Sequence, residues 1–346
     1  MKHALVSIIS TQTLPNVLFI KQMGVRHYDR HYFITTRQME RQGCSHNIVR
    51  ATGIDPSSVH KVEVDHDDLT FIQSTLDDLS FDHTAIDVHL TGGTKIMAIA
   101  VYEYFKSRYP DRCRFFYIPH STPIILSLHS DTEEVIRLTT RVNLYEYLQA
   151  YGIRIYMQGD KDELDRQDYY NEARAFLDYI YLEKSIPKKI LQASRITYKK
   201  TDKSYYQGKW FEIFCARFVR DHFNLRDDQF AYQVRLTRDP DHPPTHYTEY
   251  DLLYVRDNKL YVGECKFFSN KLHFQKSRIL KEWYKLGSLK LSMGLNATPF
   301  ILTANFTSAN TLKDIKNALP LFHIRDYADI EVVWSIRKFK EFLDKL

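Results

Sequence analysis

The sequence predicts an α/β protein with two domains. Strands alternate with helices as far as Ile118, charged and tyrosine-rich helices follow Thr139, and an acidic β-hairpin lies in the last third of the chain. A length of 346 residues also favours two domains over one. The alternation in the first part predicts a doubly wound, mostly parallel sheet.

The composition is that of an ordinary globular protein, with 44% hydrophobic and 26% charged residues. A net charge of +5 permits a polyanionic partner without requiring one. The four cysteines form no C-x-x-C pair, so neither a disulfide framework nor a structural zinc site is predicted. The apolar run 4–9 is too short for a signal peptide, and no stretch is long enough to cross a membrane. We therefore expect a cytoplasmic protein with no membrane partner.

The elements of the first domain follow from apolar, β-branched runs and from helix start and stop signals. The expected strands are 4–9, 31–35, 59–64, 85–90 and 114–118, and the expected helices begin near Leu14 and cover 67–79 and 96–108. Thr13 is the expected N-cap of the first helix, with Pro15 in its first turn. Pro110 ends the last of these helices.

The turn T-G-G-T-K at residues 91–95 follows one of these strands and opens a helix. Glycine lets the backbone approach a ligand closely, and a helix N-terminus offers free N–H groups and a positive dipole end to an anion. The threonines add hydroxyls and Lys95 adds a charge. Open α/β sheets bind ligands at the carboxyl ends of their strands, so this turn and residues 10–13 predict a phosphate site. The alternative is a plain helix cap with a tight turn.

A helical connector is expected over 141–203, with helices at 141–150 and 162–183. The second domain is expected over 204–346. Its predicted elements are a helix over 209–222, a strand over 230–236, the hairpin 250–267, a basic helical region over 271–290, and strands over 299–303 and 330–334. The loop 237–248 contains three prolines and is a candidate lid.

The hairpin carries the chemistry of this second domain. Asp251 opens its first strand, and Glu264 and Lys266 share one face of its second strand because strand side chains alternate. Cys265 faces the other way. A divalent metal ion held by Asp251 and Glu264 would explain two carboxylates on an apolar hairpin. The alternative is a surface salt bridge between Glu264 and Lys266.

Two segments, A-L-V-S-I-I-S-T-Q-T and D-V-H-L-T-G-G-T-K-I-M-A-I-A, resemble those of CARF domains. These Rossmann-like sensors bind cyclic oligoadenylate second messengers in type III CRISPR immunity. The resemblance covers residues 1–140 and implies a homodimer with a ring-shaped ligand across its twofold axis, usually cyclic tetra-adenylate and sometimes hexa-adenylate. The ligand-binding residues it implies are Ser10, Gln12, Thr13, Thr36, Thr91, Gly92, Gly93, Thr94 and Lys95.

The second domain resembles the PD-(D/E)xK nucleases, which share a restriction-endonuclease-like α/β fold. An acidic residue on a helix is followed by E-Y-D and then by E-C-K on adjoining strands, although the proline of the family motif is replaced by Tyr250. The resemblance implies Mg²⁺ or Mn²⁺ held by Asp251, Glu264 and the carbonyl of Cys265. The catalytic residues it implies are Glu212, Asp251, Glu264 and Lys266.

Together the two resemblances imply a nuclease of DNA, RNA or both that is activated by a cyclic oligoadenylate. Two alternatives remain open. One is a catalytically silent sensor that only binds nucleic acid. The other is a constitutive restriction- or repair-type endonuclease whose first domain binds an unrelated nucleotide.

Overall fold

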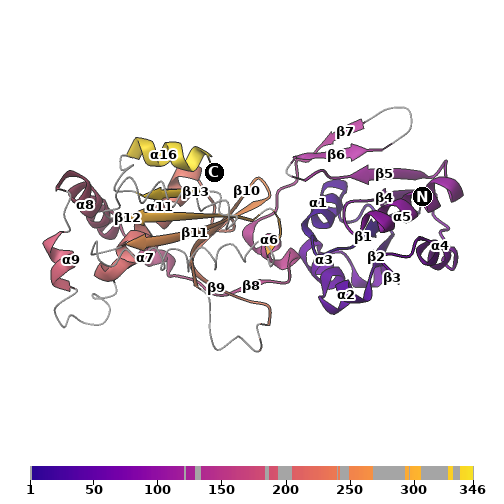
Figure 1. The fold of residues 1–346 in the computed structure, drawn as a ribbon, viewed down its shortest axis with the longest axis horizontal. Coiled ribbons are helices and arrows are strands. Elements are labelled where there is room, and N and C mark those ends of the chain that lie inside the picture. The colour runs from indigo at the N-terminus through magenta and orange to yellow at the C-terminus, as the bar shows by residue number, and fades with distance from the viewer. Residues whose placement is uncertain are drawn as a thin grey trace. The chain divides into compact units, whose positions relative to one another are not determined.

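The computed structural model describes residues 2–120, 122–128, 134–183, 187–193, 205–239, 241, 249–267, 293–295, 297–304, 326–329 and 336–345. It divides into two compact units, residues 1–154 and 155–346 (Figure 1). The division falls inside the predicted connector 141–203, whose residues are shared between the two units. Among the helices that the structure describes, none is long and apolar enough to span a membrane.

Unit 1 is built on a seven-stranded sheet with the order β3-β2-β1-β4-β5-β6-β7. The first five strands are mutually parallel, and β6 and β7 extend the sheet as an antiparallel edge that the sequence did not predict. The strands are β1 (His3–Ile8), β2 (Arg30–Thr35), β3 (Val59–Glu63), β4 (Ala85–His89), β5 (Cys113–Tyr117), β6 (Ile124–Ser127) and β7 (Glu134–Arg137).

Helices cover both faces of this sheet. On one face α4 and α5 close an apolar core with alternate β1 residues, Ala4, Val6 and Ile8. On the other face, Phe19 of α1 stacks on His89 of β4, and α1, α3 and α6 pack on one another. The helices are α1 (Leu14–Met23), α2 (Arg37–Arg41), α3 (Cys44–Thr52), the short 3-10 helix η1 (Pro56–Ser58), α4 (Leu69–Asp77), α5 (Lys95–Arg108) and α6 (Leu144–Ala150).

The strand order places a topological switch point between β1 and β4. The chain leaves β1 towards β2 on one side, and it later enters β4 on the other side of β1. The loops that follow these two strands therefore diverge at the carboxyl edge of the sheet, the position where open α/β sheets bind ligands. Both loops are those for which the sequence predicted a phosphate site.

Unit 2 contains a six-stranded sheet with the order β13-β12-β11-β10-β9-β8. Strands β9, β10 and β11 are antiparallel, whereas β11, β12 and β13 are parallel. The strands are β8 (Arg154–Met157), β9 (Phe230–Thr237), β10 (Glu249–Arg256), β11 (Lys259–Phe267), β12 (Ala297–Ala304) and β13 (Asp326–Asp329).

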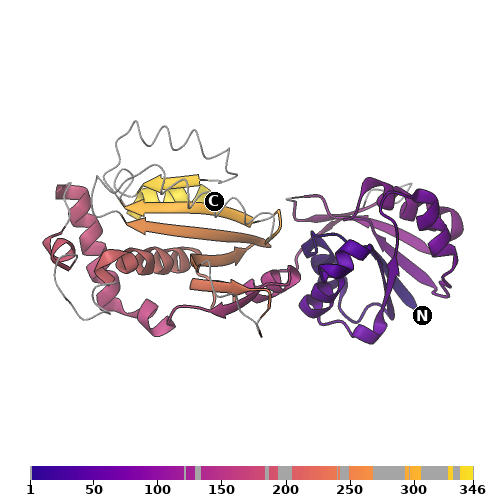
Figure 2. The same ribbon diagram turned by 60° about the horizontal axis from the view of Figure 1, so that its bottom comes forward.

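The helices of unit 2 pack against this sheet, and Figure 2 shows the long helices beside the strands. Helix α11 contributes Trp210, Phe211 and Phe214 to a core that also contains Leu252 of β10 and Cys265 of β11. The helices are α7 (Lys161–Asp165), α8 (Gln167–Glu183), α9 (Lys188–Ala193), the π-helical turn η2 (Tyr205–Lys209), α11 (Trp210–Phe223) and α16 (Ile336–Lys345).

The predicted hairpin is present as β10 and β11, joined at Asp257 and Asn258. Both turn residues have positive φ, 51° and 61°. Two-residue turns of this conformation match the right-handed twist of the strands that they join. Other predictions cannot be compared in this way. The basic region 271–290, the strand 330–334 and most of the loop 237–248 lie outside the described residues.

Candidate functional sites

The loops after β1 and β4 touch at the carboxyl edge of unit 1. Gly92 has φ +127°, and a Cβ there would lie 2.8 Å from the carbonyl oxygen of Ile8 and 3.3 Å from Oγ of Ser10. A Cβ on Gly93 would lie 2.5 Å from the side chain of Ile8. Both positions therefore require glycine, and the T-G-G-T-K turn lies directly on the end of β1.

Two of the predicted hydroxyl donors are committed to internal bonds. Thr13 is 1% exposed and donates its hydroxyl to the carbonyl of Ala150 in α6. Thr94 caps α5 by accepting from the N–H of Met97 at 3.2 Å, and it donates to the carbonyl of His66 at 2.6 Å. Thr13 and Thr94 thus hold the two loops in place, and their hydroxyl hydrogens are directed at the protein.

The hydroxyl oxygens of three other predicted residues accept hydrogen bonds from backbone N–H groups. Ser10 accepts from the N–H of Gln12 at 3.2 Å, Thr36 accepts from Met39 at 3.3 Å, and Thr91 accepts from Ile118 at 2.6 Å. Each hydroxyl can still donate its hydrogen to an incoming oxygen. Lys95 is exposed at the start of α5, where the free N–H groups and the dipole also favour an anion.

The interior beneath these loops holds polar groups that sequence reasoning missed. Asn16 of α1 donates to the carbonyl of Ile8 at 3.2 Å, and its side-chain oxygen lies 2.9 Å from Nδ1 of His89. Burial lowers the pKa of His89 to about 3, so the ring is neutral. Tyr151 donates to the side-chain oxygen of Gln12 at 3.4 Å. Tyr151 lies 139 residues away from Gln12 in the chain, so no local pattern could have revealed this contact.

In unit 2 the hairpin brings Asp251 and Glu264 together. The register pairs Leu252 with Gly263, and one step further places Asp251 opposite Glu264. Directly opposed side chains in an antiparallel pair share a face. The exposed fractions of Asp251 and Glu264 are 5% and 1%, so two carboxylates are buried side by side. The alternative ion pair between Glu264 and Lys266 is present at 2.6 Å, but its carboxylate is buried and does not lie on the surface.

Lys266 and the backbone N–H of Cys265 contact these two carboxylates. Nζ of Lys266 lies 2.6 Å from Glu264 and 3.6 Å from Asp251. The N–H of Cys265 donates to Oδ2 of Asp251 at 2.5 Å, which fixes that carboxylate across the two strands. One ammonium does not offset two buried carboxylates. Burial and the charge of Glu264 raise the pKa of Asp251 well above its usual value.

Glu212 lies near this pair but not within the same tight group. It accepts from Gln233 of β9 at 3.2 Å, and burial raises the pKa of its carboxyl. The charges of Lys266 and Glu264 also act on it. Within the described part of the chain, Glu212, Asp251 and Glu264 do not form a set whose ligand atoms all lie within 4.8 Å of one another. Glu212 therefore belongs to the surroundings of the pair.

The two remaining hairpin candidates have other partners. Glu249 is bonded to Arg235 of β9, whose Nε and Nη2 each lie 2.9 Å from Oε2 of Glu249. The thiol of Cys265 is buried beside Cys215 of α11, on the face opposite Glu264, and burial raises its pKa. Its side chain is thus part of the apolar core, which leaves its backbone as the group nearest the carboxylates.

The donor set of the hairpin fits a hard divalent cation. Mg²⁺ and Mn²⁺ prefer carboxylate oxygens, and a buried, like-charged pair whose repulsion favours protonation is stabilised when a cation enters between them. Asp251 and Glu264 supply those oxygens on adjacent strands. Lys266 lies beside them, with its Nζ 2.6 Å from Glu264.

Comparison with known proteins gives a family match for one unit and a fold for the whole chain. Residues 4–147 match the family model described as the Card1 CARF domain. Can2 from Sulfobacillus thermosulfidooxidans, solved in complex with cyclic tetra-adenylate, has a TM-score of 0.72 and 18% identity, with 99% of each chain covered. Protein VC1899 from Vibrio cholerae has a TM-score of 0.70 and 15% identity, covering 99% of this chain and 97% of that one.

A search of curated protein sequences finds no match. The likenesses to Can2 and VC1899 show a common fold over the full length, since both identities are low. The family match supports a CARF domain in unit 1.

Proposed function

We propose that this protein is a metal-dependent nuclease activated by a cyclic oligoadenylate, acting in type III CRISPR defence. The observation that carries the proposal is the buried pair Asp251 and Glu264 with Lys266 beside it, in a chain whose residues 4–147 match the Card1 CARF domain. The fold that the chain shares with Can2, which was solved with cyclic tetra-adenylate, supports that ring as the activator.

The activator would bind at the carboxyl edge of unit 1. Its phosphates would meet the N-terminus of α5 and Lys95, and Ser10, Thr36 and Thr91 would donate to oxygens of the ring. A ring with repeated phosphates suits two copies of this edge related by a twofold axis. The exposed Ile96 and Ile99 of α5, at 36% and 49%, offer apolar surface for a second copy of the chain.

Unit 2 would perform phosphodiester hydrolysis. A bound Mg²⁺ or Mn²⁺ would supply Lewis acidity and lower the pKa of a water molecule. Asp251 and Glu264 would hold that ion, with Asp251 oriented by the N–H of Cys265. Lys266 would orient the attacking water or stabilise negative charge on the phosphate. Glu212, which accepts a hydrogen bond from Gln233, would hold a metal-bound water molecule at the edge of the site.

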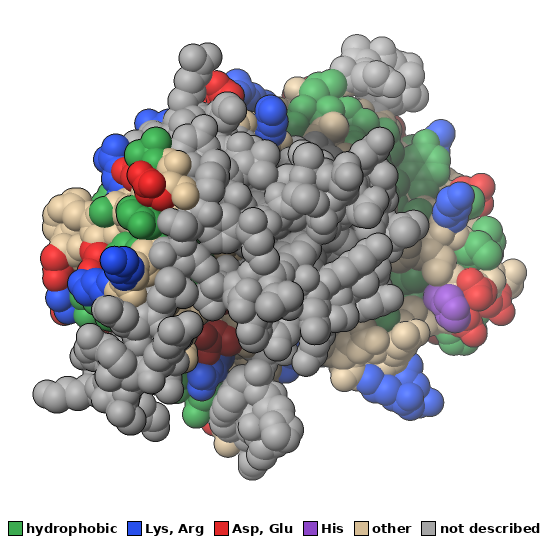
Figure 3. All heavy atoms as spheres, turned by 60° about the vertical axis from the view of Figure 1, so that its left-hand side comes forward, with side chains coloured by type: hydrophobic (Ala, Val, Ile, Leu, Met, Phe, Trp, Pro, Cys, Tyr) green, Lys and Arg blue, Asp and Glu red, His purple; other side chains and the backbone are tan. Residues whose placement is uncertain are grey.

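The substrate would be DNA, RNA or both. Basic and acidic side chains lie beside one another on the face drawn in Figure 3, so the described residues there form no uniform basic track. Arg166 is paired with Asp168 and Lys189 with Glu172, so these basic side chains of unit 2 also lie beside acidic ones. Contacts to the substrate would then fall near Lys266 and in the basic region 271–290 that the sequence predicts.

The test is cleavage of a supercoiled plasmid and of a single-stranded RNA by the full-length protein with Mn²⁺, with and without cyclic tetra-adenylate. Cleavage only with both additions is the expected result. Cleavage without the activator would identify a constitutive nuclease. Binding of the activator with no cleavage of either substrate would identify a silent sensor, and both outcomes would overturn the proposal.

A further inference from the structure

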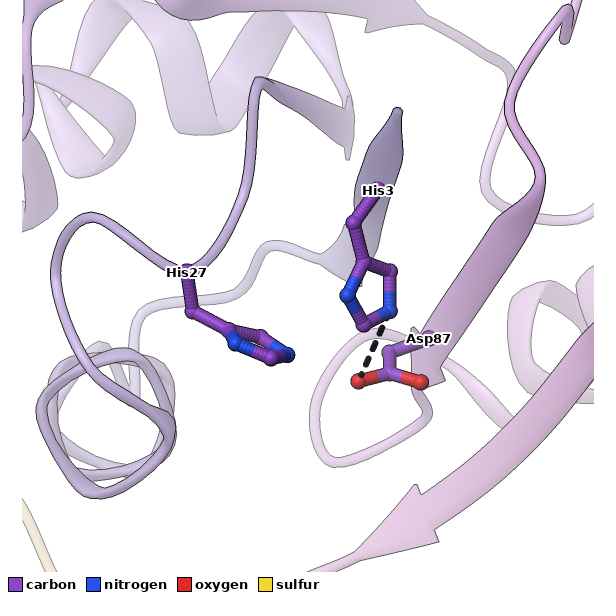
Figure 4. Close-up of side chains that lie close together, drawn as sticks. All are labelled: His3, His27 and Asp87. Carbon is purple, nitrogen blue, oxygen red and sulfur yellow. Dashed lines mark ion pairs between the residues drawn. The ribbon is translucent and has the colours of Figure 1, made fainter. Parts of the chain in front are cut away.

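A cluster of histidine and carboxylate side chains lies at the amino edge of the sheet in unit 1. The loops after β1 and β4, where the activator is proposed to bind, lie at the other, carboxyl edge of the same sheet. His3 begins β1, His27 lies between α1 and β2, and Asp87 lies on β4. Figure 4 shows the ring of His3 between the other two side chains. In the described portion of the molecule, this is the one group of three whose possible ligand atoms all lie within 4.8 Å of one another.

We propose that His3, His27 and Asp87 form a binding site for a divalent transition-metal ion such as Zn²⁺. Imidazole nitrogens and a carboxylate oxygen are ligands that zinc takes in tetrahedral sites, where three protein ligands leave one position open. Around one tetrahedral ion the ligand atoms are about 3.3 Å apart. Nε2 of His3 already lies 3.5 Å from Oδ2 of Asp87. His27 is exposed, so its ring can close the remaining distance by rotation.

An unpartnered nitrogen is the second observation that points to a ligand. Nε2 of His3 is buried from solvent and has no hydrogen-bond partner, although it faces a carboxylate. A buried polar atom without a partner is costly, and an ion is one way to satisfy it.

The loop that carries His27 is fixed before any ion arrives. The N–H of Asp29 donates to the carbonyl of His3 at 2.8 Å, and the N–H of His3 donates to Oδ2 of Asp29 at 2.7 Å. The N–H of His27 donates to the carbonyl of Gly24 at 3.0 Å, which folds the loop back. These bonds hold two of the three ligand-bearing segments together, so little chain ordering would accompany metal binding.

Asp87 has outer partners of the kind that orient metal-binding carboxylates. Arg114 donates to both of its oxygens, at 2.9 and 3.0 Å, and the hydroxyl of Tyr28 donates at 2.8 Å. The guanidinium also offsets the charge of Asp87, so the carboxylate would contribute little to holding a hard cation. The two imidazoles must then supply most of the affinity, which favours zinc-like ions over Mg²⁺.

The alternative reading is a packing cluster with no ion. His3, His27 and Tyr28 contact one another edge to face, with ring centroids 4.4 to 5.0 Å apart, beside the Asp87–Arg114 ion pair. Such contacts alone would stabilise the loop. Metal titration separates the two readings because packing predicts no affinity for zinc.

The experiment is Zn²⁺ titration of full-length protein against a chromophoric chelator. All proteins carry Asp251→Asn, so that the site proposed in unit 2 does not contribute. This background is expected to bind one Zn²⁺, and adding His27→Ala should weaken binding at least about tenfold. The matched control is His46→Ala, which removes an exposed histidine of α3 and should change the affinity by no more than about twofold.

A second readout guards against misfolding of variants. Co²⁺ bound to the background protein should give the visible absorption of nitrogen-ligated cobalt, and His3→Gln should lose that spectrum. Because His27 is exposed, its alanine variant decides the question even where His3→Gln fails to fold. Absence of Zn²⁺ binding in the background protein, or equal affinity with and without His27, would overturn the proposal.

Discussion

The two units each bury an aspartate on an inner strand, and the surroundings of the two carboxylates are opposite. Asp87 in unit 1 is met by a bidentate guanidinium, a tyrosine hydroxyl and a histidine. Asp251 in unit 2 faces a second buried carboxylate, with one ammonium at 3.6 Å. Arg114 pairs with the first carboxylate, whereas the second lies beside another buried carboxylate that shares the ammonium of Lys266. The same residue type thus belongs to the nitrogen-rich site proposed in unit 1 and to the oxygen-rich site proposed in unit 2.

The largest expected effect comes from removing one carboxylate of the buried pair Asp251 and Glu264. Glu264→Ala should reduce Mn²⁺-dependent cleavage by at least about 100-fold, because it deletes a proposed ligand and not an outer residue. Binding of cyclic tetra-adenylate should be unchanged. Glu249→Ala on the neighbouring strand, where the native carboxylate is bonded to Arg235, is the control and should keep most activity. Full cleavage by Glu264→Ala would remove the metal site from unit 2.

The next effect concerns the contact between the two loops of unit 1. Gly92→Ala places a Cβ 2.8 Å from the carbonyl of Ile8 at a φ of +127°, so it should destabilise unit 1 by about 1–3 kcal/mol and abolish activator binding. Gly53→Ala is the matched control, since its φ is +71° but no atom lies within 4 Å. Thermal unfolding and activator titration would measure both. Equal effects of the two substitutions would show that backbone strain alone is responsible.

A smaller effect is expected from the single charge at the start of α5. Lys95→Ala should weaken binding of cyclic tetra-adenylate roughly tenfold or more, the size of one lost hydrogen bond to a charged group. Cleavage at saturating activator should be retained. Lys106→Ala, near the other end of the same helix and bonded to Tyr102, should leave the affinity unchanged. An unaltered affinity of the Lys95 variant would place the phosphates elsewhere.

The smallest effect is a dependence of the free energy of unfolding on pH, which Mn²⁺ should reverse. The folded-state pKa of Asp251 is raised, first by burial, so the folded protein binds a proton that the unfolded chain releases. Its contribution to stability is present below the ordinary aspartate pKa and is lost as pH rises through the higher folded value. The loss is at most about 1.4 kcal/mol per pH unit for one proton. Unfolding of metal-free protein across this range, compared with Asp251→Asn, measures it; identical pH profiles would contradict it.

Addition of Mn²⁺ should reverse this trend in the native sequence. Above the raised pKa the carboxylate is ionised and available to the cation, so the thermal stabilisation by Mn²⁺ should grow with pH. The Asp251→Asn protein should respond much less. A stabilisation by Mn²⁺ that is the same in both proteins would place the ion outside the hairpin.

Comparison of the two units also shows what a sequence can reveal. The five parallel strands and the hairpin were predictable because their apolar runs are buried, and strand alternation alone placed Glu264 and Lys266 on one side. The edge strands β7 and β8 were not predicted because each has only four residues, and neither shows an alternation of apolar and polar side chains. The nuclease and metal assignments of the hairpin stay predictions that the cleavage assay must decide.

Tertiary contacts account for what the site prediction lacked. Thr13 has the right residue type for a ligand contact, but its hydroxyl is bonded to Ala150 at the end of α6, 137 residues away. Glu212 lies on the expected helix, yet the distance from that helix to the hairpin depends on core packing and not on any local pattern. The parallel pairing of β1 and β4 brings His3 near Asp87, and the bonds between His3 and Asp29 bring the loop of His27 to them, so no local pattern could reveal this cluster.

The contact of Gly92 with the end of β1 has a consequence for the timing of recognition. The turn is bonded to Ile118 through Thr91 and to His66 through Thr94, so its shape does not depend on the proposed activator. Binding of the proposed activator should therefore require no rearrangement of this turn, and its association rate should be set by diffusion and charge. The lifetime of the signal would then depend on how slowly the ring departs.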